Sequence, residues 1–145
     1  GDYSYIKIKK NKIHLIDESY NSNPLSLDFA LNKFNKINCK SKRKIILLGD
    51  MLELGRFSKK LHIEAAKLVN NSSINKVYVY GKYIIDTFNK IRPQKRGKIL
   101  KSTKDILNFL KNDIKDGEYL MIKGSNSTGL NTMMKNFKSG KTNAI

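Results

Sequence analysis

Asp17-Glu-Ser-Tyr-Asn-Ser-Asn-Pro24 joins a strand-like run to an amphipathic helix, and this stretch decides the fold. Asn23 is a typical N-cap residue, and Pro24 suits the first helical position because its missing N–H is not needed there. The apolar residues of Ile13–Ile16, just before the turn, predict a strand. Ligands of open α/β sheets bind in such strand-to-helix turns, so the stretch is also a candidate site.

The same arrangement occurs twice more along the chain. Leu48-Gly-Asp-Met-Leu-Glu-Leu-Gly55 follows the apolar run Ile45–Leu48, and Lys123-Gly-Ser-Asn-Ser-Thr-Gly129 follows Tyr119–Ile122. The carboxyl ends of parallel strands meet at one edge of a sheet, so we expect the three turns to lie together. They predict one site.

Strands and helices alternate along the rest of the chain, which indicates an α/β protein with a parallel sheet. We expect a Rossmann-like, three-layer domain over residues 1–145, with a mostly parallel sheet of about six strands, an N-terminal edge hairpin and helices on both faces. The strands are expected at Tyr5–Lys9, Ile13–Ile16, Lys44–Leu48, Lys76–Tyr80, Lys98–Leu100 and Glu118–Ile122. The residues expected to face inward on the helices are Leu27, Ala30, Leu31, Phe34, Leu61, Ala65, Leu68, Val69, Ile84, Ile85, Phe88, Ile91, Ile106, Leu107, Phe109, Leu110, Leu130, Met133, Met134 and Phe137.

Length and composition favour one soluble, cytoplasmic domain. The 145 residues suffice for one core, and the apolar runs are far shorter than the roughly 20 residues of a membrane span. We find no signal peptide. A single cysteine, Cys39, and two distant histidines, His14 and His62, provide neither an internal disulfide nor zinc-ligand spacing.

The formal net charge of +17 raises the question of a nucleic-acid partner. Almost all of the excess is lysine, whereas arginine is the better fork for phosphates and bases. Basic and aromatic residues are also not interleaved on one predicted strand face, as a stacking platform would require. These points argue against nucleic acid, although the charge should attract anionic substrates.

The first turn offers several polar side chains. The carboxylates of Asp17 and Glu18 could accept ribose hydroxyls or help to hold a metal, or could cap the turn. The amides of Asn21 and Asn23 suit a phosphate or peptide group, although Asn23 could serve only as a helix cap. Tyr20 could stack on a base or simply pack.

The other two turns add acids and an anion-binding pattern. Asp50 and Glu53 lie in a loop whose apolar residues indicate packing against another element. At the third turn, Gly124 lets backbone amides approach an anion, while Lys123 neutralises it and Ser125 donates a hydrogen bond.

No complete catalytic apparatus is found in the chain. Gly140-Lys-Thr142 imitates the end of a P-loop, but Lys135 stands where that motif requires glycine. The dinucleotide fingerprint and the serine nucleophile elbow are both missing.

Three segments together resemble the C-terminal domain of the Mur ligase family: Ile16–Ser26, Leu48–Gly55 with His62, and Lys123–Ser125. Their order, spacing and position after strands match over nearly the whole chain. The resemblance is closest to the branch that adds D-alanyl-D-alanine, because sibling enzymes tend to carry a Tyr-Ala-His-x-Pro version of Ser19–Pro24.

The resemblance implies an ATP-dependent amide ligase of peptidoglycan precursor synthesis in the bacterial cytoplasm. Such an enzyme activates a carboxylate of UDP-N-acetylmuramoyl-tripeptide as an acyl phosphate, which the amine of D-Ala-D-Ala attacks. A UDP-sugar domain and a central ATPase domain, which binds most of the ATP and Mg²⁺, belong to the family's architecture and are absent from this chain. The isolated chain is therefore expected to be inactive, and its role is to close over ATP and position the dipeptide.

The family pattern also implies roles for individual residues. Glu18 stands where many relatives have aspartate, and Asn126 replaces a frequent arginine, which puts the contacts of both in doubt. His62 fits a structural histidine bonded to the second turn better than a catalytic one. The residues implied to face the nucleotide are Asp17, Glu18 and Tyr20; those implied to face the acyl phosphate and dipeptide are Asn21, Asn23, Asp50, Glu53, Lys123, Ser125 and Asn126.

Two alternatives stay open. One is a related Mur-type ligase that adds a different amino acid, and the other is a freestanding Rossmann-like module that binds RNA or small anions.

Overall fold

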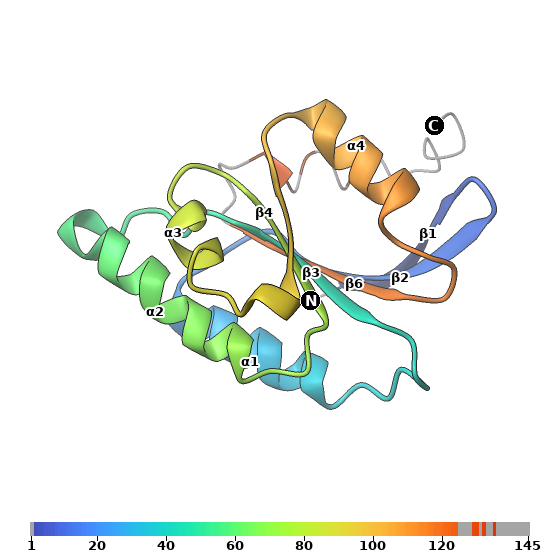
Figure 1. Cartoon of the computed structure of the whole chain (residues 1–145), viewed down its shortest axis with the longest axis horizontal. Helices are drawn as coiled ribbons and strands as arrows, with labels where there is room; N and C mark the ends of the chain where they lie inside the picture. Colours follow the sequence, from blue (N-terminus) through green and yellow to red (C-terminus); the bar gives the residue numbers. More distant parts are fainter. Residues whose placement is uncertain (1, 125–128, 131, 133–134, 136–145) are drawn as a thin grey trace.

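The computed structural model describes residues 2–124, 129, 130, 132 and 135, and within them a six-stranded sheet forms the middle layer (Figure 1). The strand order is β1-β2-β6-β3-β4-β5; β1 pairs with β2 in an antiparallel manner, and every other pair is parallel. The predicted edge hairpin and parallel sheet are therefore confirmed. The strands are β1 (Asp2–Ile8), β2 (Asn11–Glu18), β3 (Lys44–Gly49), β4 (Lys76–Tyr80), β5 (Arg96–Leu100) and β6 (Tyr119–Lys123).

Helices cover both faces of the sheet, which gives the three layers expected (Figure 1). Helices α1, α2 and α3 pack on one face, where the core includes Phe34, Ile46 and Met121. Helix α4 packs on the other face, where the core includes Leu47 and Phe109. The helices are α1 (Pro24–Asn35), α2 (Ser58–Asn70), α3 (Ile84–Phe88) and α4 (Thr103–Asn112), with short 3₁₀ turns at η1 (Gly55–Phe57) and η2 (Pro93–Lys95).

Strand β3 shows why this sheet is buried in its centre. Each of its six residues is buried, as expected for a parallel strand with helices on both sides. Its side chains alternate between the two cores, with Ile45 and Leu47 in one and Ile46 and Leu48 in the other.

Helix α1 begins with a reciprocal capping box. The side chain of Asn23 accepts a hydrogen bond from Ser26 N at 2.8 Å, and Ser26 Oγ accepts one from Asn23 N at 3.0 Å. Pro24 occupies the first helical turn. The predicted capping role of Asn23 is thus confirmed, and this cap fixes where the first turn ends.

Two helix expectations need correction, and a third is tested only at Leu130. In α2, Leu61 is only half-buried and His62 and Ala66 are buried as well, while Leu68 is half-buried but packs against the core as predicted. Helix α3 ends at Phe88, so Ile91 is a core residue of the turn that follows. Of the last predicted helix, Leu130 is buried, while Met133, Met134 and Phe137 lie outside the described residues.

Within the described part of the chain, no helix has the length and apolar character needed to cross a membrane.

Candidate functional site

The three predicted turns follow β2, β6 and β3, which are neighbours in the sheet. Lys123 at the end of β6 lies in register with Glu18 on one side and with Leu48 on the other. The polar residues that follow these strands therefore start from one edge of the sheet, as the sequence predicts. This carboxyl edge contains the ligand position expected for an open α/β fold.

Lys123 joins the third turn to the first. Its side chain is only 3% exposed, and Nζ donates a hydrogen bond to the backbone oxygen of Asn21. Burial lowers the pKa of Lys123, and the nearby charge of Glu18 acts in the opposite direction. A buried ammonium group at this edge is a strong local source of positive potential.

The first turn separates into buried and accessible residues. Asp17 is 2% exposed, and its Oδ1 accepts hydrogen bonds from the backbone N of Ser19 at 3.0 Å and from the Ser19 hydroxyl. This geometry matches the turn-capping alternative for Asp17. Tyr20 and Asn21 are exposed, and Glu18, Asn23 and Pro24 are half-buried, so Tyr20 and Asn21 are the most accessible residues of this turn.

A further lysine approaches this turn from the far end of the chain. Lys135 Nζ lies 6.0 Å from the centroid of the Tyr20 ring. Together with Lys123, it makes the surroundings of the first turn positive, which suits an anionic ligand.

The second turn sends its two acids in different directions. Asp50 is buried, with Oδ1 accepting from Ile84 N at 2.7 Å and Oδ2 accepting from Lys82 N at 3.1 Å. Glu53 is exposed and has a left-handed backbone with φ of 62°. Asp50 therefore holds the loop after β4, while Glu53 remains accessible to solvent.

His62 is a structural residue of the second turn. Its ring is fully buried, Nε2 accepts from Met51 N at 3.1 Å, and Nδ1 donates to the backbone oxygen of Ser58 at 2.7 Å. Both ring nitrogens are thus engaged within the chain, as the sequence predicts. The same bond explains the burial of Met51, because it draws the loop onto α2.

A hollow of about 470 Å³ lies at the carboxyl ends of β3, β4 and β5, on the same sheet edge. No motif in the sequence predicts this hollow. The one signal is Gly81, a glycine directly after a predicted strand, and its φ of 147° in the structure is one that other residues rarely adopt. The residues that line the hollow are Asp50, Leu52, Tyr80, Gly81, Lys82, Ile85, Ile99, Leu100 and Lys101.

The remaining predicted site residues are Ser125 and Asn126, which lie outside the described residues. Their roles stay predictions. Among the residues that are described, no group of three or more histidine, cysteine, aspartate or glutamate side chains could hold a metal ion.

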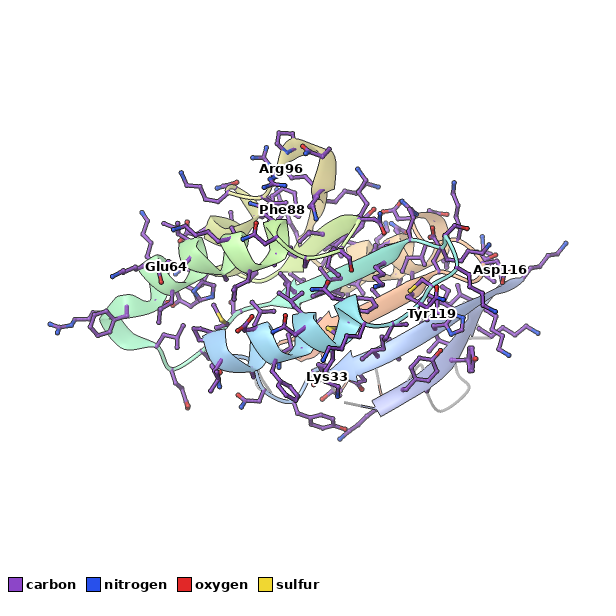
Figure 2. The ribbon with its side chains drawn as sticks, turned by 90° about the horizontal axis from the view of Figure 1, so that it is seen from below. Lys33, Glu64, Phe88, Arg96, Asp116 and Tyr119 are labelled. Atoms are coloured by element: carbon purple, nitrogen blue, oxygen red, sulfur yellow. The ribbon has the colours of Figure 1, made fainter. Side chains whose placement is uncertain are left out.

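One expectation about the strand faces is wrong. Tyr5 on β1 pairs with His14 on β2, the His14 ring stacks on Tyr119 with centroids 3.9 Å apart, and Lys12 Nζ lies 4.1 Å from the Tyr5 ring. Basic and aromatic side chains therefore do share one face. Figure 2 labels Tyr119, which is half-buried and also packs against the core that α1 and α2 cover.

Comparison with known proteins gives a consistent picture. The sequence model of the family described as "Mur ligase, glutamate ligase domain" matches residues 5–126. UDP-N-acetylmuramoyl-tripeptide–D-alanyl-D-alanine ligase of Bacillus subtilis is 28% identical over 126 residues, which cover 85% of this chain and 27% of that protein. The Rickettsia prowazekii enzyme of the same name is 30% identical over 138 residues, covering 92% of this chain and 29% of the enzyme.

Solved structures share the fold. MurF ligase from Thermotoga maritima, determined in complex with ADP, aligns with a TM-score of 0.69 at 22% identity, covering 93% of this chain and 30% of that one. A MurF structure from Acinetobacter baumannii aligns with a TM-score of 0.75 at 22% identity, covering 94% and 30%. The chain thus spans less than a third of the length of these proteins.

Proposed function

The chain belongs to the family of Mur ligase, glutamate ligase domains, and from this premise we propose that it serves an ATP-dependent ligase that adds D-alanyl-D-alanine to UDP-N-acetylmuramoyl-tripeptide. The observation that carries the proposal is the contact between Lys123 and Asn21, which unites two of the three motif turns at the carboxyl edge. The names of the curated relatives support the choice of substrates.

The proposed reaction requires the residues at the carboxyl edge mainly to position the reactants and to neutralise charge. The dipeptide amine attacks the carbonyl carbon of an acyl phosphate, a C–N bond forms, the C–O bond to phosphate breaks, and the phosphate leaves with the electron pair. The amine proton passes to the departing phosphate, which balances the step. Lys123 stabilises the negative charge that develops on the phosphate, and the Asn21 amide orients the reacting groups.

Lys123 suits this role because its environment is dry. Burial lowers its pKa, yet the neighbouring Glu18 favours its charged form. A cation held in a low-dielectric setting stabilises transition-state charge more strongly than one in water.

The accessible side chains of the first turn fit the nucleotide. Tyr20 can cover a base, and Glu18 can accept a hydrogen bond from a ribose hydroxyl. We propose that Mg²⁺, which would neutralise phosphate charge, is bound mainly by another domain of the full-length protein. The proposed activity belongs in the bacterial cytoplasm.

The test is nucleotide turnover by the full-length protein. We expect ADP release with UDP-N-acetylmuramoyl-tripeptide to depend on D-Ala-D-Ala and to fall when Asn21 is replaced by alanine. Release that is stimulated by a single amino acid instead of the dipeptide would point to a sibling ligase. Release that no amine stimulates would contradict the ligase assignment.

A second candidate function is favoured by the aromatic face of the hairpin. Tyr3 and Tyr5 are exposed there, and Lys12 lies over the Tyr5 ring. Such a face can stack bases of single-stranded RNA. Salt-sensitive binding of a short RNA that is lost in Tyr5→Ala would support this function, whereas binding unaffected by that change would exclude the face as its site.

A further inference from the structure

Three loops form the amino edge of the sheet, opposite the three motif turns. They are the hairpin turn between β1 and β2, the loop before β3 and the loop before β6 (Figure 1). Gly117 N donates to the oxygen of Lys12 at 2.8 Å, and Tyr119 N donates to the oxygen of Arg43 at 3.0 Å. A Cβ added at Gly117 would lie 3.1 Å from Lys42 Cε, so this side chain also lies against the loop before β6. The three loops therefore form one surface.

Exposed lysines from all three loops gather on this surface. None of them forms an ion pair with a residue that the structure describes. One of them, Lys12, places Nζ 4.1 Å from the centroid of the Tyr5 ring, a contact that leaves its charge in place. These amino-edge lysines are Lys9, Lys10, Lys12, Lys40, Lys42 and Lys115.

The acids at this edge do little to neutralise the amino-edge lysines. Glu118 accepts its hydrogen bonds from Arg43, and Asp113 pairs with Lys98 at 3.1 Å. Asp116 is exposed, and its Oδ1 accepts from a backbone N–H at 2.7 Å. The surface therefore carries a strong excess of positive charge, which attracts an anionic partner.

The kind of cation and its position favour an extended anionic surface over a nucleic-acid strand. The guanidinium of Arg43 is held by Glu118, so the edge offers point charges on flexible stems instead of a planar fork for a base or a single phosphate. The amino-edge lysines do not line the hollows beside β4, β5 and α2. Single-stranded nucleic acid, in contrast, is usually held in a groove that follows its backbone.

An exposed tyrosine borders the amino-edge lysines. Tyr5 is 48% exposed and lies next to Lys12. Tyrosine is enriched at membrane–water interfaces, because its ring is apolar and its hydroxyl group stays hydrated. Clustered lysines are attracted to the negative surface potential of anionic lipids. Together these residues suit a membrane surface.

We propose that the amino edge binds peripherally to a membrane surface that contains anionic phospholipids, through the amino-edge lysines and Tyr5. The proposal does not depend on the ligase function. Strand β6 has five residues and connects the two edges, so they lie roughly 17 Å apart. A protein bound in this way directs its carboxyl edge, with Lys123 and Asn21, away from the membrane.

The experiment is co-sedimentation of the full-length protein at low salt with vesicles of equal parts phosphatidylglycerol and phosphatidylcholine. Each lysine near such a surface strengthens binding about fivefold. The triple variant Lys9→Gln, Lys40→Gln, Lys115→Gln removes one lysine from each loop and should lower the partition coefficient about 100-fold. Vesicles of phosphatidylcholine alone should bind the unsubstituted protein at least tenfold more weakly, and about 1 M salt should abolish binding.

The matched control is the triple variant Lys59→Gln, Lys60→Gln, Lys104→Gln, which removes the same charge elsewhere. These exposed lysines lie in the first turns of α2 and α4, which begin after the carboxyl ends of β3 and β5. Figure 2 shows Glu64, which pairs with Lys60, at the end of the molecule opposite Asp116. The control should keep its partition coefficient within about threefold.

Equal losses in the two triple variants would reduce the effect to net charge and overturn the proposal. Equal binding to both kinds of vesicle would also overturn it, and this comparison needs no substitution. Binding of a short single-stranded RNA through the same lysines, without binding to vesicles, would overturn it in favour of RNA. Urea unfolding checks that both variants are folded, and because the assay contains no substrate its result is separate from that of ADP release.

Discussion

Two buried lysines lie at opposite edges of the sheet, and their surroundings differ. At the amino edge, Lys44 donates to the oxygen of Asn35 at 3.2 Å and to the hydroxyl of Ser73 at 3.1 Å. At the carboxyl edge, Lys123 has one hydrogen-bond acceptor among the described residues, the backbone oxygen of Asn21. Lys44 thus stabilises the C-terminal end of α1, whereas the ammonium group of Lys123 retains N–H donors for a ligand.

The glutamates at the two edges of the sheet also differ in their surroundings. At the amino edge, Glu118 accepts two hydrogen bonds from Arg43, at 2.5 Å from Nε and 2.9 Å from Nη2, and hydrogen bonding to Glu118 raises the pKa of Arg43. At the carboxyl edge, Glu18 acts through its charge on the nearby Lys123, and Glu53 is exposed to solvent. Changes at the amino edge should therefore reduce stability, while those at the carboxyl edge should reduce activity.

Gly81→Ala should have the largest effect on stability. The new Cβ would collide with the buried Asp50 carboxylate and would require a backbone φ of 147°, so we expect a loss of about 3 kcal/mol in the free energy of unfolding. Gly55→Ala is the control, since its φ is 58° and nothing lies within 4 Å of an added Cβ; about 1 kcal/mol is expected. Urea unfolding measures both, and equal losses would contradict the role of Asp50.

Glu118→Gln tests the amino edge. It leaves the Arg43 charge without its carboxylate, and we expect a loss of about 2 kcal/mol in unfolding free energy with unchanged turnover. Glu64→Gln removes an exposed helix pair with Lys60 at 4.0 Å and should cost about 0.3 kcal/mol. If Glu118→Gln lowered turnover in the folded protein, the division between the two edges would be wrong.

Asn23→Ala and Asn21→Ala separate the two amides of the first turn. Asn23 caps α1, so its replacement should lower the free energy of unfolding by about 1 kcal/mol. Asn21 is exposed, and its contact with Lys123 uses the backbone, so its replacement should leave stability unchanged while lowering turnover. Thermal unfolding and ADP release on both variants make the comparison.

The smallest effect concerns His14. Burial and the charge of Lys12 lower its pKa below the ordinary value, so the folded state disfavours the protonated ring. Stability from this group is therefore present above about pH 6.5 and declines as the pH falls through the folded pKa, by less than about 1 kcal/mol. His14→Phe should reduce the difference in unfolding free energy between pH 7.5 and pH 5, and an unchanged difference would contradict this.

Much of the fold could be predicted from the sequence, because the spacing of apolar residues and the capping residues indicate the same helices and strands. The stripe that includes Leu27 and Phe34 and the cap at Asn23 define α1 correctly. The inward face of α2 is harder to predict from the sequence. His62 is buried because its ring forms two hydrogen bonds, and the pattern of apolar residues does not indicate them.

The proximity of Asn21 and Lys123 could be predicted from the sequence, because each follows a strand-like run, and the two strands are neighbours in the sheet; their roles in a site stay predictions. Contacts between residues on different strands could not be predicted in this way. The bond from Asp50 to the β4 loop depends on the packing of β3 beside β4. Lys82 and Lys101 resemble the many other lysines until the fold brings them to one hollow.

The most direct test of the contrast between the edges compares Lys123→Met with Lys44→Met in dipeptide-dependent ADP release by the full-length protein. We predict that Lys123→Met loses about 100-fold or more in kcat/KM without a loss of stability, because burial already disfavours its charge. Lys44→Met should keep kcat/KM within twofold and lose about 1 kcal/mol of stability. Unchanged turnover in Lys123→Met, or equal losses of turnover in both, would contradict the account.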